Sequence, residues 1–180
     1  MNNTDLIIEQ TKKWIIDVVI GCNFCPFAAK EVKQNTVHYE VELSDQPVTC
    51  LQSFLTECRR LDQHPSIETS FLILPNAVPD FAGYLNLLSS AEKIIKKNGY
   101  EGVYQVASFH PLYRFADAPD GDAANYTNRS LYPMLHLLRE ESIEQALKKY
   151  PEPERIPERN ILFAREKGAA YMKMLRDACL

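Results

Sequence analysis

Histidine, arginine and aspartate side chains gather between Phe109 and Glu140, a segment that holds two of the chain's four histidines. The first half of this segment is rich in Pro, Gly, Asp and Asn, which favour turns over helices and strands. Residues that bind ligands are often carried by such loops beside a packed scaffold. The segment is therefore the first place where the sequence predicts a functional site.

A helix is expected after Asn128, with Ser130 as its cap. At offsets of three and four residues, one face of that helix would carry Arg129, Tyr132, His136, Arg139 and Glu140. Two guanidinium groups can hold a carboxylate or phosphate in a bidentate manner, and Asn128 and Tyr132 would orient it. The pattern predicts binding of an anionic small molecule. The alternative is a solvated face on which Arg139 pairs with a nearby acid.

His110 and His136 are the candidate proton carriers, because an imidazole titrates near neutral pH. His110 stands at the end of an expected strand and before Pro111, which favours an extended backbone. A purely structural role for His110 is the alternative.

Cys22 and Cys25 form a C-x-x-C pattern that is followed by Pro26. If Pro26 is the first residue of a helix, the Cys25 thiol lies at the helix N-terminus, where the helix dipole favours thiolate. Cys25 is therefore a candidate catalytic nucleophile or redox thiol. An inert thiol buried beside Phe24 and Phe27 is the alternative.

Metal and cofactor binding have weaker support. Asp117, Asp120 and Asp122 resemble a calcium loop only loosely, without its closing glutamate. His110 and His136 with one carboxylate could bind a divalent metal, although no HExxH spacing is present. No glycine-rich phosphate loop or dinucleotide fingerprint is found either. We expect no metal and no cofactor.

The composition sets broad limits on the class of protein. The 180 residues suffice for one domain over 1–180, and 46% hydrophobic with 24% charged residues is ordinary for a soluble protein. A net charge of -4 argues against nucleic-acid and anionic-membrane partners. No apolar run is long enough for a membrane span, and the first residues lack a signal-peptide pattern. A cytoplasmic location with five reduced cysteines is the expectation, and the oligomeric state stays open.

Hydrophobic periodicity predicts alternating helices and strands. In chain order we expect a helix over 4–20 that is capped by Thr4 and stopped by Gly21, a short helix from Pro26, a strand over 36–43, a helix over 45–61, a strand over 69–74, a helix over 80–97, a strand over 103–109, the loop described above, and closing helices, the last running from Pro157 to the end.

This order predicts an α/β or α+β fold, with a small three-stranded sheet, helices packed against it and C-terminal helices. Alternation favours parallel neighbours, but an antiparallel first strand and the strand order stay open. If the strands are parallel, Asn76 and His110 both follow carboxyl ends, where open sheets bind ligands.

The stretches VVIGCNFCPFA, FHPLYRF and NYTNRSLYPMLHLLREES together resemble an uncharacterised bacterial family, the domain of unknown function numbered fourteen-fifteen. The resemblance spans nearly the whole chain. The family's early motif matches Cys25 but has an aliphatic residue where Cys22 stands, which makes Cys25 the thiol of interest. The resemblance implies no activity.

The leading hypothesis is a small enzyme that acts on an anionic molecule, with Cys25, His110 and His136 as catalytic residues. Binding would fall to Asn128, Arg129, Tyr132, Arg139 and Glu140. A non-enzymatic module that binds an anionic ligand or a protein is the second hypothesis, and a metal-dependent hydrolase is the third. The leading hypothesis requires these side chains to share one pocket.

Overall fold

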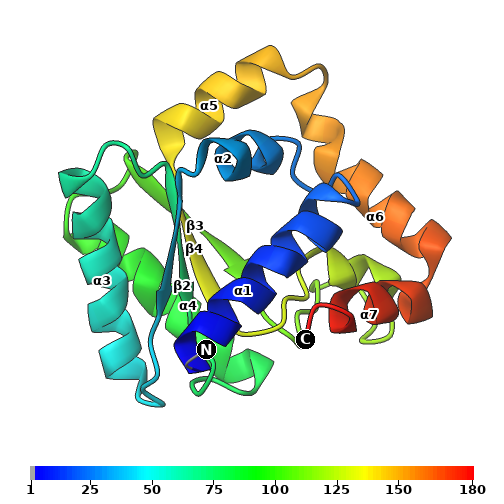
Figure 1. Ribbon diagram of the computed structural model, residues 1–180, viewed down its shortest axis with the longest axis horizontal. Coiled ribbons are helices and arrows are strands. Elements are labelled where there is room, and N and C mark those ends of the chain that lie inside the picture. Colours follow the sequence, from blue (N-terminus) through cyan, green and yellow to red (C-terminus); the bar gives the residue numbers. More distant parts are fainter. Residues whose placement is uncertain (1–2) are drawn as a thin grey trace.

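The computed structural model describes residues 3–180, and its centre is a four-stranded mixed sheet (Figure 1). The strands are β1 (Val37–Val41), β2 (Thr69–Ile73), β3 (Tyr104–Phe109) and β4 (Met134–Arg139). Their order in the sheet is β1-β2-β4-β3. β1 and β2 are parallel, and β4 is antiparallel to both of its neighbours. The three expected strands therefore all run in one direction, and the first two pair in parallel, the arrangement that alternation favoured while an antiparallel first strand stayed open.

The fourth strand is the main departure from the expected fold. The segment after Asn128 was predicted to be a helix, but Met134–Arg139 forms β4 between β2 and β3. Alternation then sends His136 to one face of the sheet and Arg139 to the other. The predicted helical face that joined Arg129, Tyr132, His136, Arg139 and Glu140 is therefore wrong. β4 is instead a central strand, largely apolar because both of its faces are covered.

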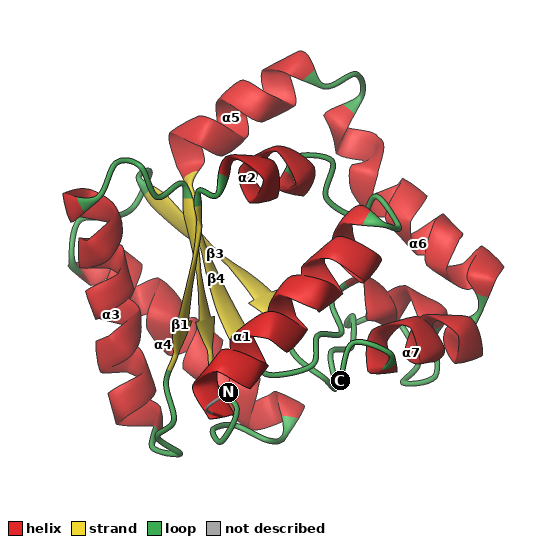
Figure 2. Ribbon diagram, in the orientation of Figure 1, coloured by secondary structure: helices red, strands yellow, loops and turns green. Residues whose placement is uncertain are grey.

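Helices cover both faces of the sheet (Figure 2). α3 (Pro47–Gln63) and α4 (Phe81–Lys97) lie on one side, where Phe54, Tyr84, Leu72 and Leu135 belong to one buried core. α1 (Asn3–Trp14) and α2 (Ala28–Gln34) lie on the other side, together with α5 (Glu140–Lys149). Asp80 caps α4, since its Oδ1 accepts a hydrogen bond from the N–H of Gly83 at 2.7 Å.

The first helix continues beyond Trp14 as a π-helical turn, Ile15–Ile20, and ends at Gly21 as expected. Thr4 lies inside α1 and is not its cap. A Cβ on Gly21 would clash with the carbonyl oxygen of Asp17. The backbone approaches so closely here that the position requires glycine. α2 starts at Ala28, two residues later than the predicted start at Pro26.

The C-terminal part consists of α5, α6 (Ile156–Lys167) and α7 (Ala169–Asp177). A single helix from Pro157 was expected, but the chain breaks at Gly168, whose φ of 85° is not helical. The 3-10 helix Ala123–Thr127 packs against α6 and α7. Across residues 3–180, none of the helices has the length and apolar character that a membrane crossing requires.

Candidate functional site

A cavity of about 640 Å³ lies over the sheet face that α1, α2 and α5 cover. Its floor comes from the strands, through Thr69, Phe71, Ala107, Phe109 and His136. Its walls come from Trp14 and the π-helical turn, from the Cys25–Val32 segment, and from α5. Most of this surface is apolar, so the few polar side chains in it decide what can bind.

His136 lies on the floor, paired across the sheet with Phe71 and Ala107. Its ring stacks on that of Phe71, with centroids 3.7 Å apart and planes within 8°. Thr69 Oγ1 lies 2.6 Å from His136 Nε2 and 2.6 Å from the carbonyl oxygen of Leu137. The single hydroxyl proton goes to that carbonyl, because the carbonyl can only accept. The hydroxyl then accepts from the Nε2–H of His136.

This tautomer leaves the Nδ1 lone pair of His136 available. No described residue hydrogen-bonds to Nδ1. Burial lowers the pKa of His136 to about 3, so the ring is neutral at physiological pH. His136 therefore offers the cavity a hydrogen-bond acceptor and carries no charge.

Two further lining residues each have a buried polar atom with no partner among the described residues. The indole Nε1 of Trp14 is buried and unpaired, and the whole side chain is 1% exposed. Glu68 Oε1, beside Thr69, is also buried and unpaired. Three residues that line the cavity thus carry an unpaired polar atom: a donor on Trp14, and acceptors on Glu68 and His136.

Cys25 forms part of the wall, as does Phe27. Burial, the larger influence, raises the pKa of the Cys25 thiol, and hydrogen bonds from the backbone N–H groups of Phe27 and Ala28 lower it in part. The helix that follows is only seven residues long. The resting group is therefore a thiol rather than the expected thiolate. All five cysteines are free, so no disulfide joins Cys25 to Cys22.

Arg139 borders the same cavity, but its guanidinium group lies on the other face of the sheet. Its Nη2 donates to the carbonyl oxygens of Leu61 at 2.7 Å and Ile67 at 3.0 Å. The group also lies over the ring of Tyr104. Arg139 thus holds the end of α3 to the sheet, since a cation suits the last carbonyl groups of a helix. Glu140 begins α5 and joins its N–H to the Val103 carbonyl oxygen.

Lysines supply positive charge at the cavity. Lys30 pairs with Glu31 at 3.1 Å, and Glu31 also accepts from Thr36 Oγ1. Lys149 is exposed on α5 and has no ion pair with any described residue. Lys149 is therefore the cation available to an anionic group on a bound molecule.

His110 lies outside this cavity, although it was expected to share a pocket with Cys25 and His136. Its ring is fully buried beside Phe81 and Tyr84. Nδ1 accepts from the N–H of Leu112 at 3.0 Å, and Nε2 donates to the Val78 carbonyl oxygen at 3.0 Å. Burial lowers the pKa of His110. With both nitrogens engaged, the geometry corresponds to the structural alternative.

Arg129 is also remote from the cavity and anchors the Pro- and Asp-rich loop. Its guanidinium donates to the carbonyl oxygens of Tyr113 and Asp120, each at 2.9 Å, and pairs with the Asp120 carboxylate at 3.2 Å. It also lies over the ring of Tyr126. Arg129 thus orders the loop and does not bind a ligand in the cavity.

Asn128 and Tyr132 are likewise engaged away from the cavity. Asn128 Nδ2 donates to the carbonyl oxygen of Ser108 at 3.1 Å. The Tyr132 hydroxyl donates to Gln10 Oε1. Of the eight predicted site residues, Cys25 and His136 therefore line one cavity. Arg139 borders the same cavity, but its guanidinium group lies on the other face of the sheet.

The aspartates of the loop do not gather around a point. Asp122 caps the 3-10 helix and pairs with Arg165 at 2.7 Å, whereas Asp120 pairs with Arg129. Among residues 3–180, the group whose donor atoms lie close enough to share a metal ion is His38, Glu40 and Glu57. It contains neither His110 nor His136.

Sequence reasoning missed several residues of interest. Trp14 is a buried residue of α1, and its unpaired indole N–H is visible only in three dimensions. The His38-x-Glu40 spacing was visible as the polar side of an alternating strand. Its partner Glu57 lies on a helix, and no local pattern links it to that strand.

Comparison with known proteins agrees with the family resemblance described above. A family model described as protein of unknown function, DUF1415, matches residues 6–174. Searches of curated proteins and of solved structures gave no significant match. Since the family model spans nearly the whole sequence, the chain belongs to the DUF1415 family.

Proposed function

We propose that this protein binds a small molecule in the cavity between the sheet and helices α1, α2 and α5. The observation that carries the proposal is that three residues lining one space, Trp14, Glu68 and His136, each have a side-chain polar atom without a hydrogen-bond partner among the described residues. A buried polar atom without a partner costs about 1–3 kcal/mol. A bound molecule that supplies those partners would recover this free energy.

The lining indicates the chemical class of the molecule. Phe71 and Phe109 offer aromatic surface to an apolar or aromatic body. Trp14 Nε1 would donate to an acceptor on the molecule, and His136 Nδ1 would accept from a donor such as a hydroxyl or amide N–H. Lys149 would attract an anionic group at the mouth of the cavity. The proposed ligand is thus an aromatic molecule with a hydrogen-bonding group and, at one end, an anionic group.

A melting-temperature screen tests this proposal. Phenol, benzamide, benzoate and phenyl phosphate, each titrated into the purified full chain, cover neutral and anionic aromatic ligands. A molecule that binds only the folded chain raises its stability as the concentration exceeds Kd. We expect at least one of these probes to give a saturable rise.

A matched pair of variants locates the binding site. Ala107 pairs across the sheet with His136 on the cavity floor, so Ala107→Leu fills part of the space. Ala82 is exposed on α4 on the far side of the sheet, and Ala82→Leu is the control. The rise should be lost in Ala107→Leu and kept in Ala82→Leu. No response to any probe, or equal responses in both variants, would contradict the proposal.

Covalent chemistry at Cys25 is the second candidate function. One observation favours it: Cys25 lines the cavity, and the nearby backbone N–H groups of Phe27 and Ala28 lower the pKa of its thiol in part. In such a step the sulfur would add to a carbonyl carbon of the ligand, the π electrons of the C=O bond would move to its oxygen, and the thiol proton would pass through His136 Nδ1 to that oxygen. Burial raises the pKa of Cys25 and lowers that of His136, so this proton transfer is unfavourable before a ligand binds.

Alkylation by iodoacetamide separates binding from catalysis. If the ligand lies against Cys25, a saturating probe should protect this thiol from alkylation. Cys25→Ser should then keep the ligand-induced rise in melting temperature. If Cys25 is also the nucleophile, the same variant loses turnover of a substrate found through the probes, while its affinity for that substrate stays near the parent value.

A further inference from the structure

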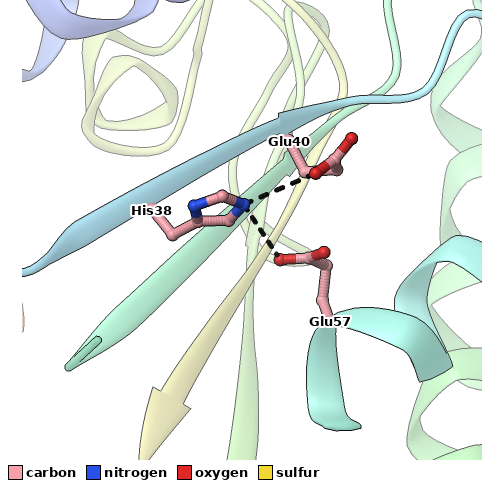
Figure 3. A group of neighbouring side chains, drawn as sticks. All are labelled: His38, Glu40 and Glu57. Carbon is pink, nitrogen blue, oxygen red and sulfur yellow. Dashed lines mark hydrogen bonds and ion pairs between the residues drawn. The ribbon is translucent and has the colours of Figure 1, made fainter. Parts of the chain in front are cut away.

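A second polar cluster lies on the opposite face of the sheet from the cavity. His38 and Glu40 project from β1 toward α3, and Glu57 projects from α3 toward them (Figure 3). We propose that His38, Glu40 and Glu57 bind a divalent transition-metal ion.

The spacing of the three donor atoms carries this proposal. His38 Nε2 lies 3.4 Å from Glu40 Oε2 and 3.7 Å from Glu57 Oε2, and all three atoms lie within 4.8 Å of one another. These separations are long for direct hydrogen bonds. Two ligands of one tetrahedral zinc ion, each bonded at about 2.1 Å, stand about 3.4 Å apart. The imidazole and the carboxylates are thus spaced as ligands around a common point (Figure 3).

Neighbouring side chains hold the carboxylates in place. Ser70 Oγ donates to Glu57 Oε2 at 2.6 Å, and Arg60 Nε donates to Glu57 Oε1 at 2.8 Å. Arg60 Nη2 also donates to Glu40 Oε2 at 3.0 Å. Outer hydrogen bonds of this kind orient the carboxylate ligands of metal sites.

The side chains of the cluster carry a net negative charge that a cation would compensate. Glu57 is 1% exposed, and a buried carboxylate needs a compensating charge. Two carboxylates face the single guanidinium of Arg60, which leaves one negative charge uncompensated when His38 is neutral. A divalent ion would reverse that imbalance and satisfy both carboxylates and the imidazole.

The donor set indicates the class of metal. One imidazole nitrogen with two carboxylate oxygens suits Zn²⁺, Mn²⁺ or Fe²⁺ better than the oxygen-seeking Ca²⁺ and Mg²⁺. The side chains of His38 and Glu40 are 27% and 38% exposed, so solvent reaches the cluster. Three protein ligands would leave a coordination position open to water or to another molecule.

Calorimetric titration of the full chain with Zn²⁺, after treatment with a chelator, tests the site. The parent should bind one equivalent, and His38→Gln should weaken that binding at least tenfold. His38→Gln removes a partly exposed imidazole, and its melting temperature without metal shows whether it is folded. His64→Gln, at an exposed histidine outside the cluster, should bind Zn²⁺ as the parent does.

Titration with Co²⁺ distinguishes this cluster from the cysteines. Nitrogen and oxygen ligands give visible bands without the sulfur-to-metal charge-transfer absorption of a thiolate complex. The proposal predicts the former spectrum in the parent and its loss in His38→Gln. Absence of binding in the parent, a thiolate spectrum, or unchanged affinity in folded His38→Gln would each overturn the proposal.

Discussion

Acid should destabilise this protein through His136, and the structure allows the effect to be sized. Burial lowers the pKa of this ring to about 3 in the folded chain, whereas an unfolded histidine titrates near 6.5. Below pH 6.5 the unfolded chain binds the proton and the folded chain does not, so protonation favours unfolding. The loss of stability starts near pH 6.5 and grows as the pH falls toward 3.

Each pH unit in that window costs up to about 1.4 kcal/mol, so a fall from pH 7.5 to 4.5 costs about 2.7 kcal/mol through this group alone. His136→Phe removes the titrating group and keeps an aromatic ring against Phe71. Urea unfolding of parent and variant at several pH values gives the free energy of unfolding at each. The difference between the two should change by about 2 to 3 kcal/mol over this range.

His110 also contributes to the acid sensitivity of the parent, because burial lowers its pKa as well. It is present in both proteins, so its contribution cancels in the comparison. His64→Gln, at an exposed ring outside the cavity, is the substitution control. If parent and His136→Phe lose stability in parallel from pH 7.5 to 4.5, His136 is not held neutral by folding, and the reasoning fails.

Three further predictions concern the thiol of Cys25, the turn at Gly21 and the loop that Arg129 anchors. Iodoacetamide should alkylate Cys25 slowly at pH 7 and faster above pH 9, because burial raises the pKa of this thiol; mass spectrometry of the labelled peptide would show this, and a rate already at its plateau at pH 7 would contradict it. Gly21→Ala should lower the free energy of unfolding by about 1–3 kcal/mol, because the new Cβ meets the Asp17 carbonyl oxygen, while Gly121→Ala, with open space around it, should be nearly neutral in the same urea assay. Arg129→Ala should expose the loop 113–122 to limited proteolysis, whereas Arg114→Ala, at an exposed side chain, should leave the cleavage pattern of the parent; equal cleavage of both would remove the anchoring role of Arg129.

Most of the scaffold followed from periodicity. The alternation in 36–43 and the apolar run in 69–74 predicted β1 and β2, and a helix was predicted over 80–97, where α4 lies. These segments have signals within a few residues, because burial of one face, or of both faces in β2, sets the pattern of apolar residues. Local sequence was therefore enough to place them.

The segment Met134–Arg139 shows why β4 was missed. MLHLLR is a short run of mostly apolar residues, and such a run fits a buried helix or a central strand equally well. The segment forms a strand because it pairs with β2 on one side and β3 on the other, and these two partners are placed beside it only in the folded chain. His136 consequently reaches the cavity from a strand, and Arg139 is turned to the opposite face.

The prediction of a shared pocket depended on side-chain partners that sequence does not show. Arg129 and His110 have residue types typical of active sites, yet backbone carbonyl groups of distant segments occupy their donors. Glu57 was overlooked because a buried acid on a helix is recognised only when its neighbours on another element are known. Chemical type thus indicated candidates, and tertiary contacts separated anchoring residues from those that face the cavity.

The indole N–H resonance of Trp14 gives the most direct measurement of the proposed binding site, because the chain contains one tryptophan. In ¹H–¹⁵N spectra, the resonance should move as a melting-temperature hit such as benzoate or benzamide is added, and the shift should saturate with the same Kd. Ala107→Leu should abolish this movement. A hit that raises the melting temperature and leaves the indole resonance unmoved would show that the molecule binds elsewhere, and would contradict the account.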